Sequence, residues 1–153
     1  MHYILKTLMK NKTIIWDNLY EEILAKEYGE YGYPELTHRL TVDTYAIQHP
    51  GKSSRQSIQS VNIHLISLYA VLNKSFDGKK ATKLIGDILA KQPAFGWLDP
   101  PDPNGAKTVK DVLLATDKDE HERFVREWAE DVFGCWYLKH GQAIEGLVNI
   151  GWV

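Results

Sequence analysis

The sequence predicts an all-α fold, a bundle of five or six helices around a central antiparallel helical hairpin. Apolar residues recur at spacings of three to five in one segment after another, which is the pattern of amphipathic helices. Pro and Gly residues separate these segments. The connection at residues 49–53 is short, so the helices on either side of it should be antiparallel neighbours. A chain of 153 residues is expected to form a single helical domain over residues 1–153.

The first two predicted helices lie on either side of a connector that contains glycine. Residues 1–10 fit either a short strand or a helical turn, and Thr13 is expected to cap a helix that stops at Gly29. The second helix is expected to begin at Pro34, because a first turn does not use the N–H that Pro lacks, and to run to about Gln48. The apolar stripe of the first helix consists of Ile15, Trp16, Leu19, Tyr20, Ile23, Leu24 and Tyr28.

The third and fourth predicted helices follow the hairpin turn. Ser53 or Ser54 is expected to cap the third helix, and Asn73 is expected to end it. The fourth helix is expected from about Asp77 to Lys91. The third helix carries the clearest apolar stripe of the chain, which is Ile58, Val61, Leu65, Leu68 and Leu72, and the fourth carries Leu84, Ile85, Ile88 and Leu89.

A proline-rich segment separates these helices from the C-terminal ones. Residues 93–107 hold four of the six prolines, so a long loop that acts as a lid or a linker is expected there. A short helix should run from Thr108 to Leu114. The acidic run at 117–122 should begin the longest helix as a solvated first turn, which suits the helix dipole. Phe95, Trp97 and Leu98 are expected to pin the loop, and the inner stripe of the last helix consists of Val125, Trp128, Val132, Trp136, His140, Ala143, Ile144 and Leu147.

The composition excludes several classes of function. A net charge of −2 gives no electrostatic reason to bind nucleic acid, and no window reaches the ~20 apolar residues of a membrane span. Cys135 is the only cysteine, so no disulfide can form within the chain and a cytoplasmic location is expected. Its thiol lies among aromatic neighbours and is interpreted as a packing group rather than a nucleophile. The partners expected are a small molecule and a second copy of the chain, as in a homodimer.

The hairpin suggests a site between its two helices. His38 lies thirteen residues before Gly51 and His64 lies thirteen residues after it, so the two imidazoles should face each other across the helix pair. By the same register, Tyr45 should oppose Ser57. Two imidazoles from different helices can begin a metal site, and a divalent transition metal such as zinc is the expected cofactor.

The other members of the predicted site lie near these two histidines. Asp43 follows His38 by one and a half turns, and His140 lies on the inner stripe of the last helix, so both are candidate ligands. His49 cannot share the ion with His38, since eleven residues of helix separate them by about 16 Å. The predicted metal ligands are His38, Asp43, His64 and His140, and the predicted pocket around them consists of Tyr45, Gln48, His49, Ser57 and Ser60.

Each of these residues also has a simpler interpretation. Histidines near an apolar face are more often hydrogen-bonded groups than metal ligands. Asp43 can pair with Arg39, which lies four residues earlier on the same helix. Ser57 and Ser60 can be small packing residues that let the two helices approach closely. The histidine spacing also matches no compact zinc signature such as HExxH.

Two stretches of the hairpin resemble a known family. HRLTVDTYAIQHPG followed by SRQSIQSVNIHLISLYAVL is similar to the motif of a bacterial family classed as a domain of unknown function. The resemblance extends over residues 36–140 and includes the stretch WAEDVFGCWYLKH. It implies an uncharacterised helical protein whose motif has polar positions at His38, Asp43, Tyr45, Gln48, His49, Ser57, His64 and His140.

Three functions are consistent with these patterns. The leading hypothesis is a metal-binding helical bundle in which an open coordination position serves a hydrolase or transferase acting on a small substrate. The alternative is a module without catalytic activity that binds a small ligand or another protein through a hydrogen-bonded pocket of His, Asp and Tyr. The third is a structural domain that acts as a homo-oligomer through exposed aromatic residues.

Overall fold

A computed structural model describes the backbone of residues 2–152 and the side chains of residues 15–152. The described backbone forms six helices and no strand, which confirms the predicted all-α fold. The helices are α1 His2–Tyr28, α2 Glu35–Gln48, α3 Arg55–Lys74, α4 Gly78–Ala90, α5 Val109–Val112 and α6 Lys118–Trp152.

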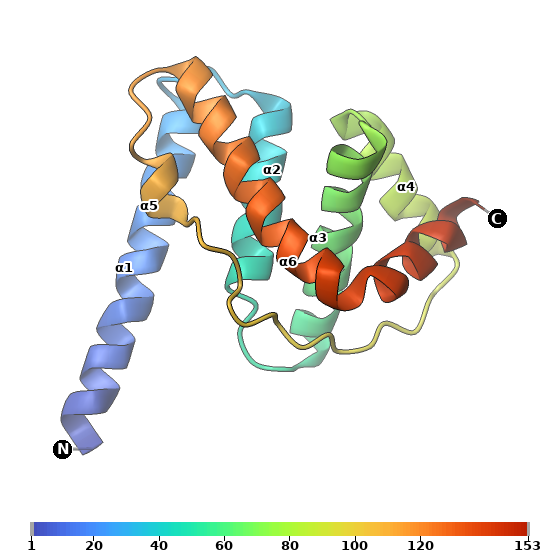
Figure 1. The fold of residues 1–153 in the computed structure, drawn as a ribbon, viewed down its shortest axis with the longest axis horizontal. Helices are drawn as coiled ribbons and strands as arrows, with labels where there is room; N and C mark the ends of the chain where they lie inside the picture. Colours follow the sequence, from blue (N-terminus) through green and yellow to red (C-terminus); the bar gives the residue numbers. More distant parts are fainter. Residues whose placement is uncertain (1, 153) are drawn as a thin grey trace.

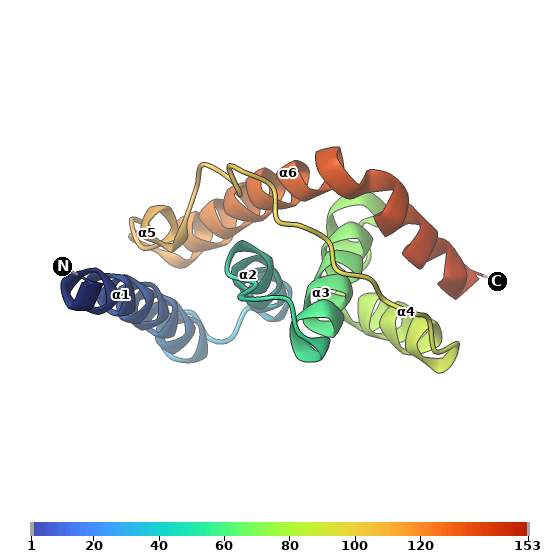
Figure 2. The ribbon, with the colours of Figure 1, turned by 90° about the horizontal axis from the view of Figure 1, so that it is seen from below.

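The helices form two layers. Figure 2 shows α1, α2, α3 and α4 in one row, with α5 and α6 lying across them on one side. Helix α6 packs on α2, α3 and α4, and α5 packs on α1 and α6. In Figure 1, α2 runs downward and α3 runs back upward beside it, so the central pair is antiparallel, as the short connection predicts. The second layer therefore joins helices that are far apart in the row.

The N-terminal helix is longer than predicted. Helix α1 begins at His2 instead of after Thr13, so the predicted cap at Thr13 is wrong, and so is the strand alternative for residues 1–10. The stretch from His2 to Tyr28 contains no Gly or Pro, so nothing in it ends a helix. Thr13 resembles a cap only because polar residues precede an apolar pair there.

The other helices begin where local capping chemistry places them. The side chain of Ser54 accepts a hydrogen bond from the backbone N–H of Ser57 at the start of α3. Asp77 caps α4 in the same way, and Thr108 forms a capping box with Asp111 at the start of α5. These side chains satisfy backbone donors that a helix leaves without an acceptor in its first turn.

The core lies where α6 crosses α2 and α3. Trp128 and Trp136 of α6 are fully buried, and so are Leu65 and Leu68 of α3. Burying one aliphatic side chain of this size stabilises the fold by about 1.5–3 kcal/mol. The apolar stripes predicted for the two helices supply these four residues. The interface between the layers is thus built from apolar stripes that the sequence predicts.

The loop at residues 93–107, called the strap below, crosses the lower ends of the helices (Figure 1). The Asn104 amide donates to the carbonyl of Ile47 at 2.9 Å, and its side-chain oxygen accepts from the indole N–H of Trp136 at 2.9 Å. Gln48 donates to the Asn104 carbonyl at 3.1 Å. Through these bonds the strap is a fixed part of the contact between α2 and α6.

Helix α6 bends at His140, whose φ of −126° and ψ of 20° are not helical. Beyond this residue the chain turns toward α4 (Figure 1), and Ile144 and Val148 are buried there. The imidazole Nε2 of His140 lies 2.7 Å from the carbonyl oxygen of Asp99 in the strap. The bend therefore places His140 beside the strap, and its predicted position on a straight inner stripe is wrong.

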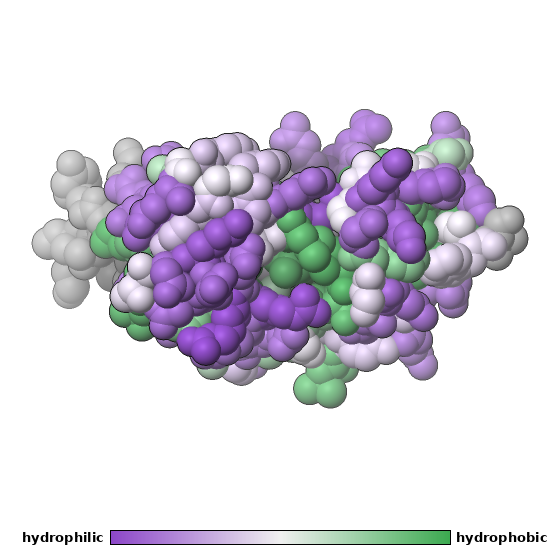
Figure 3. Space-filling view, turned by 90° about the horizontal axis from the view of Figure 1, so that it is seen from above, coloured by the Kyte–Doolittle hydropathy of each residue, from purple (hydrophilic) through white to green (hydrophobic). Residues whose placement is uncertain are grey.

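The described surface is mainly polar. Seen from above, polar side chains surround an apolar area at the centre of the face (Figure 3). Two large apolar side chains stand out singly, Leu138 at 90% exposure and Leu114 at 71%. Among residues 2–152, no helix has the length and apolar character needed to cross a membrane.

Candidate functional site

A cavity of about 350 Å³ opens between α2, α3 and α4. Ligand pockets begin at about 300 Å³, so this volume suits a small molecule. Three residues of the predicted site, His38, Asp43 and His64, line this one cavity. The rest of its wall consists of Tyr33, Glu35, Arg39, Val42, Ile63, Ser67, Gly78 and Ile85.

Asp43 is the centre of a hydrogen-bonded group in the cavity wall. Its Oδ1 lies 2.8 Å from Nδ1 of His64, and its Oδ2 accepts a hydrogen bond from Ser67 at 2.5 Å. The residue is 5% exposed, so these two donors take the place of water. With Nδ1–H donated to the carboxylate, the Nε2 of His64 is left as an acceptor.

Arg39 reaches this group through Ser67 and not through Asp43. Its Nε donates to the Ser67 hydroxyl at 2.9 Å, and its Nη1 donates to the Thr82 hydroxyl at 2.9 Å. The expected pairing of Arg39 with Asp43 along α2 is therefore replaced by bonds to α3 and α4. These bonds join three helices around the cavity.

A second buried group, which is not among the residues predicted from the sequence, lies between α1, α2 and α6. Glu27 is 0% exposed. Its Oε1 lies 2.9 Å from Nδ1 of His38, and its Oε2 lies 2.7 Å from Nε2 of His121. Thr41 donates to the same Oε2 at 2.6 Å. Three donors converge on this carboxylate, as the burial of a charged group requires. His38 belongs both to this group and to the cavity wall.

Helical spacing indicates that both Glu27 and His121 lie on the inner faces of their helices. Glu27 lies four residues after the buried Ile23 and thus on the inner face of α1, whereas Tyr28, assigned to the stripe, is 62% exposed. His121 lies four residues before Val125, the first residue of the α6 stripe. The acidic start of α6 is therefore not solvated throughout, since His121 is 1% exposed.

The serines of the predicted pocket lie away from the cavity. Ser57 belongs to the first turn of α3, where its hydroxyl accepts from Ser54 at 3.0 Å. Ser60 is half-buried farther along α3 and is not part of the cavity wall. The serine that does line the cavity is Ser67, which follows His64 by three residues and so shares its face of α3.

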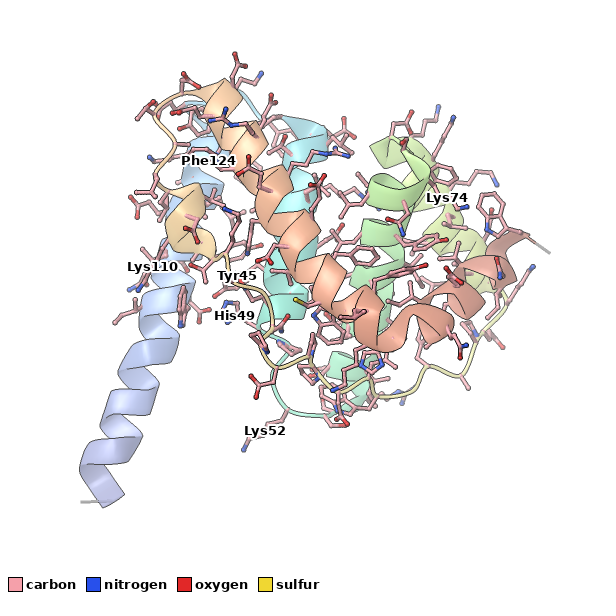
Figure 4. All side chains as sticks on the ribbon, viewed as in Figure 1. Tyr45, His49, Lys52, Lys74, Lys110 and Phe124 are labelled. Carbon is pink, nitrogen blue, oxygen red and sulfur yellow. The ribbon has the colours of Figure 1, made fainter. Side chains whose placement is uncertain are left out.

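The stripe of α2 that carries Tyr45 and His49 faces α1, so the predicted opposition of Tyr45 to α3 is wrong (Figure 4). The Tyr45 hydroxyl donates to Asp17 at 2.7 Å, and its ring stacks on Tyr20 with centroids 3.8 Å apart. Burial and this hydrogen bond raise the pKa of Tyr45, so the phenol remains the donor. The His49 ring lies 5.6 Å from that of Trp16.

The remaining predicted residues also lie outside the cavity. Gln48 joins the strap to α6, where its Oε1 accepts from the indole of Trp128 at 2.9 Å. His140 is bonded to the strap and is not one of the residues lining the cavity. Within residues 15–152, no three His, Cys, Asp or Glu side chains are grouped so as to hold a metal ion. Of the four predicted ligands, His38, Asp43 and His64 line the same cavity and His140 does not.

Comparison with protein families gives one match. The model of a family of unknown function (DUF5946) covers residues 17–137. The chain belongs to DUF5946. No curated protein and no solved structure matches the chain significantly. The DUF5946 match includes the whole cavity wall together with Glu27 and His121, and it ends before His140. The resemblance to an uncharacterised family is thereby confirmed.

Within the DUF5946 range, the aromatic contacts of His49 predict a pH effect on stability. Desolvation lowers the pKa of His49 from its ordinary 6.5, and the nearby Asp17 opposes this. The unfolded chain therefore binds the proton more tightly. The contribution of neutral His49 to the free energy of unfolding is fully present above pH 6.5. It is lost as the pH falls from 6.5 to the pKa of His49 in the folded protein.

We expect a His49→Asn variant to show a weaker loss of stability on acidification than the wild-type protein. Urea unfolding of both proteins at pH 7.5 and pH 5.5 measures the difference. Contributions of the other histidines are the same in both proteins and cancel. An equal pH dependence in the two proteins would contradict the expected role of His49.

Proposed function

We propose that the cavity binds a small polar molecule and that His64, oriented by Asp43, accepts a proton from it. The observation that supports this is the 2.8 Å contact between Asp43 Oδ1 and His64 Nδ1 in the cavity wall. A carboxylate in this position fixes the tautomer of the imidazole and stabilises the imidazolium formed when Nε2 takes a proton. The pocket in this proposal is built from Arg39, Asp43, His64 and Ser67, and Tyr45 does not line it.

Ser67 has a supporting role in this proposal and is not a nucleophile. In Ser–His–Asp hydrolases the serine hydroxyl bonds to the histidine. Here the Ser67 hydroxyl donates to Asp43 at 2.5 Å and accepts from Arg39 at 2.9 Å. It therefore holds the carboxylate and the guanidinium in place. The proposed chemistry is general base catalysis by His64, acting directly on the bound molecule or on a water molecule beside it.

Acylation by diethyl pyrocarbonate tests the role of His64, because the reagent attacks the unprotonated nitrogen of an accessible imidazole. We expect His64 to react faster than the buried His121, and Asp43→Asn to slow its acylation several-fold. Timed exposure followed by peptide mass mapping gives each rate. His140 lies outside the cavity and should be acylated at the same rate in the wild-type and Asp43→Asn proteins. If folded Asp43→Asn protein, checked by circular dichroism, acylates His64 at the wild-type rate, the role of Asp43 is rejected.

Histidine-labelled NMR spectra test the binding function separately. Small carboxylic acids, phosphates, amides and alcohols are added in turn to protein labelled with ¹⁵N-histidine. We expect at least one of these molecules to shift the signals of His38 and His64 without shifting that of His140. Its affinity should fall at least tenfold in His64→Ala, the loss expected for one well-placed polar contact. An unchanged affinity in that variant would exclude the cavity as the binding site.

A divalent transition metal held by His38 and His64 is a second candidate. One observation favours it: each Nδ1 is held by a carboxylate, His38 by Glu27 at 2.9 Å and His64 by Asp43 at 2.8 Å. Metal-binding histidines are usually oriented in this way through the nitrogen that does not bind the metal. Bound metal would displace the exposed Tyr28 hydroxyl from the Nε2 of His38, where it lies at 3.3 Å.

Zinc titration by calorimetry distinguishes this candidate. The protein is purified without a histidine tag, and wild-type, His38→Ala, His64→Ala and His140→Ala proteins are compared. If the metal binds there, His38→Ala and His64→Ala should lose zinc affinity, and His140→Ala should keep the wild-type zinc affinity. The same zinc affinity in all four proteins rejects the metal site.

A further inference from the structure

Arg39 brings a positive charge into the cavity wall and forms no direct ion pair there. None of the ion pairs formed among the described side chains includes Arg39. By contrast, Arg123 and Arg126 on α6 each pair with glutamates of their own helix. A guanidinium is charged at any physiological pH, and a partly buried charge is stabilised by an opposite charge nearby. Arg39 lines the cavity, so an anion bound there can approach the guanidinium.

The guanidinium is held in a fixed orientation by neutral groups alone. Nε donates to the Ser67 hydroxyl at 2.9 Å, and Nη1 donates to the Thr82 hydroxyl at 2.9 Å and the Gly78 carbonyl at 3.4 Å. These acceptors lie on α3 and α4 and fix the plane of the group. Nη2 donates to none of the described residues, so one edge of a pre-oriented cation remains available for a ligand.

Neither acidic residue of the cavity wall forms a direct ion pair with Arg39. Asp43 uses Oδ1 on His64 and Oδ2 on Ser67. Glu35 is exposed in the first turn of α2 and forms no ion pair with Arg39. No carboxylate of the cavity wall therefore accepts a hydrogen bond directly from the guanidinium.

We infer that the molecule bound in the cavity carries a carboxylate or phosphate group that pairs with Arg39. This inference rests on the proposed binding function and adds the chemical class of the ligand. Both groups accept charge-assisted hydrogen bonds from a guanidinium. The volume of about 350 Å³ fits a small organic acid or phosphate ester. With its anionic group on Arg39, the ligand places its other atoms beside His64, which lines the same cavity.

Calorimetric titration with succinate, inorganic phosphate and neutral succinamide tests this class. We expect the wild-type protein to bind at least one of the two anions and not the amide. Arg39→Gln should weaken anion binding at least tenfold, because the charge and the fork of donors are both lost. Arg39→Lys, which keeps the charge, should weaken it less. The anion that binds with the higher affinity shows whether the cavity prefers a carboxylate or a phosphate.

Two further variants give readouts that do not depend on the folding of Arg39→Gln. Glu35→Gln removes a negative charge from the same wall and should strengthen anion binding several-fold, opposite in sign to Arg39→Gln. Arg126→Gln changes an exposed arginine of α6 and should leave binding unchanged. Wild-type affinity in Arg39→Gln, or weaker binding in Glu35→Gln, overturns the inference.

Different measurements test the class of the ligand and the binding function of the cavity. If a neutral molecule binds at His64 while neither anion binds, the ligand class is wrong and the binding function stands. If no molecule shifts the His64 signal and its acylation is independent of Asp43, the proposed function itself fails. Circular dichroism of each variant restricts the comparison to folded protein.

Discussion

Glu27→Ala is expected to lower the free energy of unfolding by about 4 kcal/mol, because breaking a buried ionic group leaves its partners without their counterpart. Glu27 is fully buried and accepts from His38, Thr41 and His121. Removing the carboxylate leaves three polar groups of α2 and α6 without this acceptor. Urea denaturation followed by circular dichroism measures the change.

Glu22→Ala is the matched control, since Glu22 is exposed on the same helix. Its effect should lie within about 0.5 kcal/mol of zero. The loss of unfolding free energy in Glu27→Gln should lie between those of Glu27→Ala and Glu22→Ala. The amide oxygen of Gln can still accept a hydrogen bond, but its N–H₂ group faces other donors. If Glu27→Ala and Glu22→Ala unfold at the same urea concentration, the buried group does not stabilise the contact of α1 with α6.

Gly105→Ala is expected to destabilise the protein by about 3 kcal/mol, since it combines backbone strain with a steric clash. Gly105 has a φ of +86°, which a residue with a Cβ adopts only with strain. The added Cβ would lie 2.7 Å from Cγ2 of Val132 and 3.0 Å from Oδ2 of Asp131. Asp131 accepts the backbone N–H groups of Ala106 and Lys107 through that same oxygen, so it cannot move away freely.

The matched control for this variant lies in the same strap. Gly96 has no atom within 4 Å of an added Cβ, so Gly96→Ala should change the stability by less than about 1 kcal/mol. Thermal or urea unfolding of both variants compares them directly. If Gly105→Ala and Gly96→Ala were equally stable, the strap would be able to move at Gly105. That result would contradict a fixed contact between the strap and α6.

The hydrogen-bonded group around Glu27 also bears on the cavity. His38 is held by Glu27 on one side and lines the cavity on the other. Through Glu27 it is connected to His121, which lies 94 residues after Glu27 in the chain. The orientation of one wall residue of the cavity therefore depends on the docking of α1 and α6. A stability measurement on Glu27 variants should accompany any ligand measurement on His38.

Local sequence was sufficient for the helices and for most of their ends. Periodic apolar residues such as Leu65 and Leu68 are buried as predicted, and Ser54 caps α3 as one of two predicted alternatives. Helical periodicity and capping depend on residues within about one or two turns of each other, so a single stretch contains the information. Thr13 failed as a cap because a polar residue starts a helix only where the preceding residues do not already form one.

Which face of each helix meets which neighbour was decided by the tertiary structure. The spacing along α2 places His38 and Tyr45 on one side of the helix, and in the structure both contact α1. Arg39 and Asp43 contact α3 instead. A helical wheel gives relative directions on one helix and not its rotation within a bundle. That rotation is set by the packing of all the helices at once.

The sequence by itself determined an all-α chain and its central hairpin. Only the packed bundle brought Glu27 to His121, bent α6 at His140 and joined Arg39 to Ser67. These contacts connect residues far apart in the chain, and nothing near either partner specifies the other. A buried polar group is satisfied by whichever donors the fold brings to it, so its partners emerge with the tertiary structure.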